Sequence, residues 1–275
     1  MNKLIEKVRS LFSEGNIQLA IGFEKGNQGA RPFFCRSMKD TNRLVLDEHC
    51  TNNLAVYLTK PELFGTDTVA VVANLPVLRS ILQLASENQL KPEQWIILTT
   101  DHQDEVIQFG NLEEIKEYLE NNHLLSANEG NNELPNTNSQ QLLESIRSMT
   151  RERRWQYWMN EMSKCIKCYA CRAACPLCYC SQCIVEVNRP QWIQPWSAPL
   201  SNMEWQVNRV MHMAGRCVGC SACAEACPVD IPLHLLTLSM AENIREEFGV
   251  ESGNMGAKGN VLSTFKVEDK EDFIR

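Results

Sequence analysis

The sequence has 275 residues, 44% of them hydrophobic, which is long enough for two domains that each bury a core of their own. The net charge is −7 and the pI is near 5.4, so the surface lacks the basic stripe that nucleic-acid binding requires. No signal peptide and no apolar run of membrane-spanning length is visible. We therefore expect a cytoplasmic protein without nucleic-acid partners or direct membrane insertion.

Residues 1–122 predict an α/β domain, with a parallel-type sheet and covering helices. Buried strands are predicted at 17–23, 68–73 and 95–100, where apolar residues form short continuous runs. Helical spacing follows the second and third strands, at 78–87 and 112–120. Strands that alternate with helices in this way favour parallel pairing through right-handed crossovers.

The rest of the chain divides into three predicted segments. Residues 123–140 are an Asn-rich linker, and residues 251–275, rich in Gly, Asn and charge, are a mobile tail. Between them, residues 141–250 predict a mainly α-helical domain. Its helices are expected from Gln140 through the basic residues 151–154 toward Trp158, and again at 203–214 and 232–248.

The cysteines are concentrated in this second domain. Eleven of the 13 lie between Cys165 and Cys227, and only Cys35 and Cys50 lie outside. A disulfide framework would spread its bridges through the fold and would imply an oxidising compartment. Dense clustering without a secretion signal instead favours thiolates that bind metal.

Two runs of the form Cys-x2-Cys-x2-Cys-x3-Cys-Pro carry the functional prediction. In such runs three thiolates surround one iron–sulfur cubane, and the fourth, followed by proline, ligates the other cluster. We therefore predict that residues 141–250 form a mainly α-helical dicluster ferredoxin domain, with two 4Fe-4S clusters and crossed ligation. Cluster 1 is assigned to Cys165, Cys168, Cys171 and Cys227, and cluster 2 to Cys217, Cys220, Cys223 and Cys175. The alternative is structural zinc, which gains nothing from a third cysteine in register.

Three further cysteines follow the first run directly: Cys178, Cys180 and Cys183. They predict part of a third metal centre, with Cys50 or Cys35 as the fourth ligand from the N-terminal domain. Simple burial as small apolar side chains is the alternative.

Four segments of the sequence resemble the beta subunits of formate dehydrogenases. They are residues 164–183, Ile21-Gly-Phe-Glu-Lys-Gly, Ala30-Arg-Pro and the segment that begins at Cys50. These subunits belong to the deazaflavin-dependent hydrogenase and dehydrogenase beta-subunit family, whose relatives also occur with heterodisulfide-reductase-like flavin oxidoreductases. The resemblance implies an electron relay between a flavin, NAD(P)H or formate-oxidising module and a heterodisulfide-reductase-like or hydrogenase partner. Some members bind flavin and reduce a soluble carrier, such as deazaflavin, NAD or ferredoxin.

Such flavin-binding relatives carry a Gly-rich segment of the Gly-Gly-x-x-Thr-Ala kind, which is absent here, so FAD is the less favoured alternative. No Ser/His/Asp set, paired carboxylate or P-loop is found, so we predict a redox subunit without substrate chemistry of its own.

Three other features have two interpretations each. The arginines 151, 153 and 154 dock an acidic partner or form a solvated helix face. Five tryptophans between Trp155 and Trp205 form an interface or pack around the clusters, and His49 is a ligand or an ordinary polar histidine.

Overall fold

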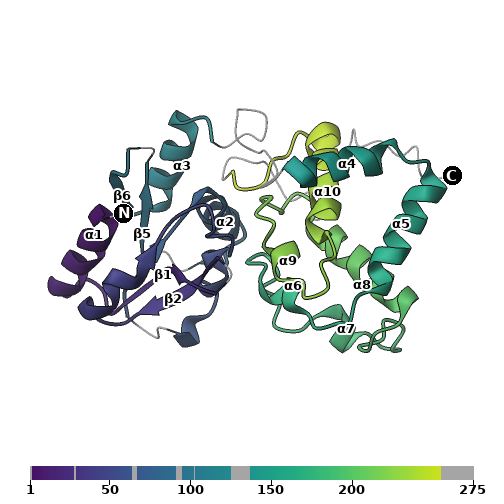
Figure 1. The fold of residues 1–275 in the computed structure, drawn as a ribbon, viewed down its shortest axis with the longest axis horizontal. Coiled ribbons are helices and arrows are strands. Elements are labelled where there is room, and N and C mark those ends of the chain that lie inside the picture. Colours follow the sequence, from purple (N-terminus) through teal and green to yellow (C-terminus); the bar gives the residue numbers. More distant parts are fainter. Residues whose placement is uncertain are drawn as a thin grey trace.

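The computed structural model describes residues 2–27, 29–63, 67–90, 95–101, 103–124 and 137–254. Figure 1 shows an N-terminal α/β part beside a C-terminal helical part. Most of the predicted linker and of the predicted tail lies outside the described residues. Nothing in the structure therefore tests those two boundaries.

The N-terminal part is built on a mixed sheet. Its strands in the described residues are β1 (Leu19–Lys25), β2 (Ala30–Cys35), β3 (Leu44–Val45), β4 (Val69–Val72), β5 (Trp95–Thr100) and β6 (Val106–Phe109). They lie in the order β2-β1-β4-β5-β6, and β3 also pairs with β1. The parallel-type prediction is confirmed for β1, β4 and β5.

The edges of the sheet are antiparallel, which the sequence interpretation did not include. β2 returns beside β1 through a tight turn that the Gly26 N–H closes by donating to the Gly29 carbonyl at 2.7 Å. Gly29 has a φ of +93°, a conformation that L side chains rarely adopt. At the other edge β6 pairs with β5. A short turn allows only the antiparallel return, because a parallel partner needs a crossover.

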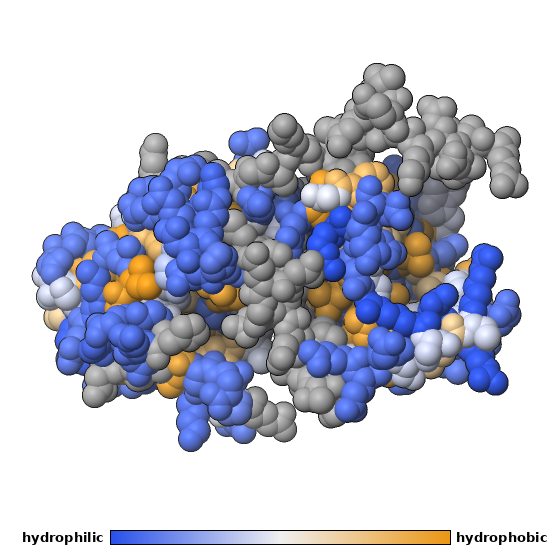
Figure 2. Space-filling view, turned by 90° about the horizontal axis from the view of Figure 1, so that it is seen from above, coloured by the Kyte–Doolittle hydropathy of each residue, from blue (hydrophilic) through white to orange (hydrophobic). Residues whose placement is uncertain are grey.

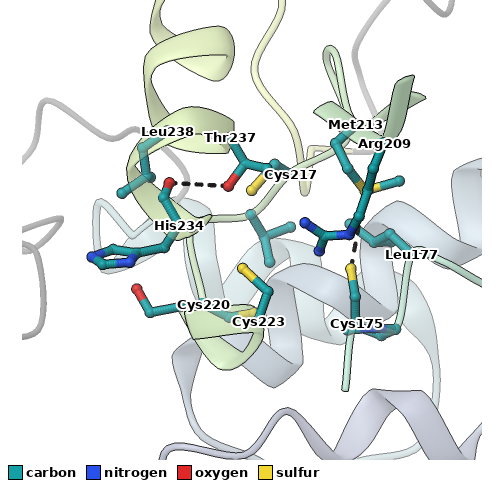
Figure 3. Close-up of a pocket in the computed structure, with 14 residues that line it drawn as sticks. Cys175, Leu177, Arg209, Met213, Cys217, Cys220, Cys223, His234, Thr237 and Leu238 are labelled. Carbon is teal, nitrogen blue, oxygen red and sulfur yellow. Dashed lines mark hydrogen bonds between the residues drawn. The ribbon is translucent and has the colours of Figure 1, made fainter. Parts of the chain in front are cut away.

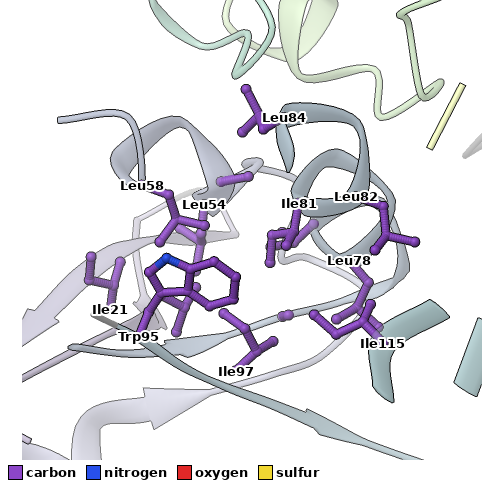
Figure 4. Packing of buried hydrophobic residues seen from close by; sticks show 14 of the residues in the cluster. Ile21, Leu54, Leu58, Leu78, Ile81, Leu82, Leu84, Trp95, Ile97 and Ile115 are labelled. Carbon is purple, nitrogen blue, oxygen red and sulfur yellow. The ribbon is translucent and has the colours of Figure 1, made fainter. Parts of the chain in front are cut away.

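Apolar side chains of the central strands alternate between the two faces of the sheet. Leu19, Ile21 and Phe23 of β1 join the cluster beneath α2 (Leu75–Ser86) and α3 (Leu112–Asn121), whereas Ala20 faces α1 (Asn2–Ser13). Figure 4 shows the first cluster, with Ile81 and Leu78 of α2 above Ile97 and Trp95 of β5. Burial on both faces explains the continuous apolar runs seen in the sequence.

The C-terminal part contains only helices and loops in the described residues. The helices are α4 (Thr137–Ser148), α5 (Arg151–Ser163), α6 (Ala170–Ala173), α7 (Ile184–Val187), α8 (Pro199–His212), α9 (Ala222–Glu225) and α10 (Leu233–Phe248). The single helix predicted from Gln140 to Trp158 is wrong at one point. It ends at Ser148 and restarts after Thr150, whose side-chain oxygen accepts the Arg153 N–H and caps the new helix.

The surface is largely polar on the face seen from above, where Figure 2 shows apolar residues in separate spots among hydrophilic ones. None of the helices in the described ranges is both long and apolar enough to cross a membrane.

The two parts share a packed and ion-paired contact. Leu177, Met213 and Val218 of the helical part belong to the same apolar cluster as the residues of α2. At the end of α2, Glu87 accepts two bonds from Arg216, to Oε1 at 2.8 Å and to Oε2 at 2.6 Å. The Tyr179 hydroxyl donates to the same carboxylate at 2.7 Å. Burial by itself raises the pKa of Glu87, but these donors outweigh it, so the pKa lies below its ordinary value.

We expect Glu87→Gln to destabilise the protein by about 3 kcal/mol near neutral pH, because it leaves a nearly buried guanidinium without its counter-charge. The Glu87 pKa is lowered in the folded state, so the pair stabilises the fold above the unfolded pKa. That contribution is lost as the pH falls through the folded pKa. Thermal unfolding of both proteins across acidic pH should show the difference between them shrinking. Lys116→Met, in the more exposed Lys116–Glu113 pair of α3, is the control and should change stability by less than about 0.5 kcal/mol.

Candidate metal centres

The two cysteine runs have the same backbone conformation. In each, the second and fourth residues after the first cysteine have left-handed φ angles, and a four-residue helix, α6 or α9, follows. These left-handed residues are Lys167 (φ 51°) and Tyr169 (φ 59°) in the first run and Gly219 (φ 75°) and Ser221 (φ 59°) in the second. Three of the four carry a side chain, which costs about 1–2 kcal/mol each in this region. Retention of that strain in both runs is typical of a functional loop.

The first cavity has a volume of about 290 Å³. Its lining includes three cysteines of the first run and the last cysteine of the second, namely Cys165, Cys168, Cys171 and Cys227. Cys165, Cys171 and Cys227 are buried, whereas Cys168 is exposed. The structure therefore brings together the four cysteines that the sequence assigned to cluster 1.

The second cavity is the counterpart of the first, with a volume of about 400 Å³. Its lining includes Cys217, Cys220 and Cys223 of the second run and Cys175, the last cysteine of the first. In Figure 3 the sulfur atoms of Cys175, Cys217 and Cys223 lie around the same space, into which Arg209 extends from α8. Each cavity thus combines three cysteines of one run with one cysteine of the other.

Hydrogen-bond donors surround the sulfur atoms. The Lys167 N–H donates to Cys165 Sγ at 3.4 Å, and the Ile231 N–H donates to Cys227 Sγ at 3.5 Å. Gln206 Nε2 donates to Cys171 Sγ at 3.9 Å. In the second cavity Gly219 and Thr237 lower the pKa of Cys217, and Asn53 lowers the pKa of Cys220, against the larger effect of burial. Such donors stabilise thiolates over thiols.

In the second cavity, burial has the opposite effect on the cysteines and favours thiols over thiolates. It raises the pKa values of Cys220 and Cys223 to about 12, so without metal these thiols are neutral at physiological pH. Cys175 is the exception, because a hydrogen bond from Cys178 lowers its pKa to about 6. Metal binding here displaces protons and couples the fold to its metal.

The polar atoms around the cavities fit an iron–sulfur cluster. Several buried side-chain atoms lack a hydrogen-bond partner in the described residues, and they gather on the two cavity walls. They are Gln206 Oε1 on the first cavity, and Arg209 Nε and Nη1, Ser221 Oγ and His234 Nδ1 on the second. Buried donors of this kind are rare unless a ligand or ion satisfies them. Cluster sulfide is an acceptor that suits the donors among them.

Zinc and an iron–sulfur cubane differ in how closely their thiolates must converge. In the described parts of the chain, no three His, Cys, Asp or Glu side chains converge closely enough to hold one metal ion. A zinc ion requires thiolates about 2.3 Å from a single centre. In a cubane each thiolate binds a different iron atom, so the sulfur atoms lie farther apart.

A larger outer pocket, of about 1020 Å³, lies beside the second cavity. Cys178, Cys180 and Cys183 all line it, and Leu177, Arg209 and Met213 line both. The structure thus brings the three additional cysteines to one pocket. It also shows Cys178 in contact with Cys175 and with Arg209.

The fourth ligands predicted for a third centre lie elsewhere. Cys50 is 4% exposed, and its Sγ accepts the Asp47 N–H at 3.4 Å, outside the lining of the outer pocket. Cys35 lies in the core beneath α1 and donates to the Ser37 carbonyl at 3.3 Å. His49 is exposed and lines none of the pockets described here.

The basic and aromatic residues separate into two groups. Arg151, Arg153 and Arg154 are exposed on α5, next to the exposed Trp155. Trp158 and Trp205 are buried in the cluster that also contains Cys165 and Cys171. Trp192 and Trp196 are exposed. Two of the five tryptophans therefore pack around the cysteines, and the other three lie at the surface.

The sequence interpretation missed the polar residues of α8 and of the N-terminal part that reach the cysteines. Gln206 and Arg209 lie three residues apart on one face of α8, and Asn53 precedes the short 3-10 helix η2 (Leu54–Tyr57). A signal was present for the first two, since both lie among apolar residues in a predicted helix. For Asn53 there was none, because its partner is more than 160 residues away in the sequence.

We expect Gly219→Ala to reduce bound iron, because it forces an L side chain into a left-handed conformation, with its Cβ 3.2 Å from Leu238. Gly15→Ala is the matched control, since Gly15 has a similar φ of +73° with no atom within 4 Å of the added Cβ. Both variants should lose about 1 kcal/mol of stability, but only Gly219→Ala should lose iron in colorimetric analysis. Equal iron in the two variants would contradict a metal-binding role for this loop.

Comparison with known proteins places the cysteine region. A family described as a 4Fe-4S dicluster domain matches residues 161–231. The beta subunit of the F420-dependent formate dehydrogenase of Methanocaldococcus jannaschii is 35% identical over 79 residues. That match covers 29% of this chain and 20% of the relative, so most of each protein lies outside it. Residues 161–231 thus match a 4Fe-4S dicluster domain, and the chain is similar in part to the beta subunit of an F420-dependent formate dehydrogenase.

Proposed function

We propose that the chain is a cytoplasmic electron-transfer subunit that relays electrons through two 4Fe-4S clusters within a multi-subunit oxidoreductase. The observation that carries this proposal is the pair of cavities, each lined by three cysteines of one run and one of the other. Iron–sulfur clusters held there supply one-electron transfer.

The chain's own residues then hold, insulate and tune the clusters. In this proposal Cys165, Cys168, Cys171 and Cys227 bind cluster 1, and Cys217, Cys220, Cys223 and Cys175 bind cluster 2. The N–H donors to sulfur raise the reduction potential, because they stabilise the more negative reduced state. The N-terminal part covers the second run with apolar residues, and from that side Asn53 lowers the pKa of Cys220.

The partner proposed for this relay follows from similarity. The relative named above is a subunit of a formate dehydrogenase. We propose that this chain likewise accepts electrons from a formate-, flavin- or NAD(P)H-oxidising subunit and passes them to a heterodisulfide-reductase-like or hydrogenase partner. Cys168, the exposed cysteine of the first cavity, marks a point where electrons can enter or leave.

Crossed ligation can be tested with two serine variants. We expect Cys175→Ser to perturb the electron paramagnetic resonance signal of the cluster held by Cys217, Cys220 and Cys223. The matched variant Cys227→Ser should perturb the other signal. The two reference spectra come from Cys220→Ser and Cys168→Ser, which each affect one trio. If Cys175→Ser instead reproduces the Cys168→Ser spectrum, ligation is not crossed and the assignment fails.

The number of clusters can be tested by native alkylation. We expect anaerobically purified protein to hold about eight irons and matching sulfide. Iodoacetamide followed by mass spectrometry should label the exposed Cys180 but not the exposed Cys168, because a bound iron protects only the latter. About twelve irons with Cys180 protected would instead establish a third centre at Cys178, Cys180 and Cys183, with a ligand other than Cys50.

One observation favours the alternative of a flavin-containing subunit that reduces a soluble carrier. The outer pocket is large, partly open and lined by Tyr179 and Trp205, so it offers aromatic surface next to the second cavity. Acid extraction of the purified protein followed by a fluorescence spectrum decides between the two. Stoichiometric flavin would support the alternative, and its absence would leave the relay.

A further inference from the structure

The guanidinium of Arg209 is buried without a carboxylate partner in the described residues. The side chain is 6% exposed and extends from α8. Its Nη2 donates to the Cys171 carbonyl at 3.4 Å, while Nε and Nη1 have no hydrogen-bond partner in the described part of the chain. Burial of an uncompensated cation costs several kcal/mol, so a stable fold requires an anion nearby.

Two other arginines at the contact between the parts do have such anions. Arg216 binds Glu87 through two nitrogens. Arg79, which is 4% exposed, lies 3.9 Å from Glu251 and donates to the Ser252 carbonyl at 3.2 Å. Arg209 differs because the ionisable groups around it are cysteine thiols rather than carboxylates.

These cysteines belong to both ligand sets. Arg209 lines the second cavity together with Cys175 and Cys223, and it binds the backbone of Cys171, whose thiol lines the first cavity. The same cysteines, as thiolates, raise the pKa of Arg209 well above its ordinary value, although burial alone lowers it. Figure 3 shows the guanidinium between Cys175 and the second run.

We propose that Arg209 is the shared counter-cation of the two clusters, a positioning residue that raises the reduction potentials of both. This inference rests on the proposed two-cluster relay. Reduction adds one electron to a cluster that is already anionic, and a fixed positive charge next to the ligands stabilises that added charge. The low dielectric around Arg209 strengthens the effect, because little water is present to screen it.

The position of Arg209 also predicts unequal effects on the reduction potentials of the two clusters. Arg209 lines the second cavity directly but reaches the first only through the Cys171 carbonyl. The α8 residues that line the first cavity are Gln206, a neutral amide one helical turn earlier, and Trp205, so neither brings a charge to it. The potential of cluster 2 should therefore depend more strongly on Arg209 than that of cluster 1.

The test is a redox titration of the full-length protein, monitored by electron paramagnetic resonance. The variants are Arg209→Gln, which removes the charge, and Arg209→Lys, which keeps it. Arg245→Gln is the control, because it removes the same charge from α10, where Arg245 lies 4.0 Å from Glu242 and lines neither cavity. Iron is counted in every sample before titration.

We expect Arg209→Gln to shift both midpoint potentials to lower values, with the larger shift at cluster 2, while Arg209→Lys and Arg245→Gln stay near the wild type. A variant Arg209→Gln with full iron and unshifted potentials would overturn the inference. If Arg209→Gln loses iron, Arg209→Lys decides. Retained iron with near wild-type potentials supports the charge role, and loss of iron there as well contradicts it. An iron-free wild-type protein would instead refute the relay itself, which the iron count reveals before any titration.

Discussion

Everything in the helical part depends on the exchange of one cysteine between the two runs. Cys175 leaves the first run to line the second cavity, and Cys227 leaves the second run to line the first. Each run is therefore an incomplete site, and neither cavity exists unless both runs are in place. The short helices α6 and α9 contact each other and fix this arrangement. Burial raises the pKa values of Cys220 and Cys223 to about 12, so metal binding there must displace their protons and is coupled to folding.

Elements outside the two runs also contribute residues to the cavities or hold the surrounding parts in place. α8 supplies Gln206 to the first cavity and Arg209 to the second. The three-residue spacing places both side chains on the helix face that runs along the two cavities. The α/β part adds Asn53 and the apolar residues of α2, and the Glu87–Arg216 pair fastens it to the segment directly before the second run. The N-terminal part is thus joined to the second cavity rather than tethered at a distance from it.

Much of this arrangement could be predicted from the sequence, since spacing alone carries it. The Cys-x2-Cys-x2-Cys-x3-Cys-Pro runs have a local geometry and a known exchange of the fourth ligand, so the grouping of eight cysteines followed without a structure. The buried strands β4 and β5 were also found, because they are short, continuous and strongly apolar at their start, as in 95–98. What could not be predicted depends on contacts distant in sequence. The antiparallel edges β2 and β6, the cap at Thr150 and the influence of Asn53 on Cys220 all involve weak local signals or partners far along the chain. Cys50, expected as a ligand of the third centre, has hydrogen bonds within its own loop, and its part in such a centre stays a prediction.

The two cavities differ in their access to water, and this has a consequence for damage. Cys168 of the first cavity is exposed, whereas no cysteine of the second cavity is. Dioxygen or peroxide arriving from solvent therefore meets the thiolate side of the first site sooner, and oxidative loss of iron should begin there. In the proposed two-cluster protein, air would therefore produce a half-loaded species in which only the cluster of the second cavity survives. The covering α/β part then acts as a shield as well as a scaffold.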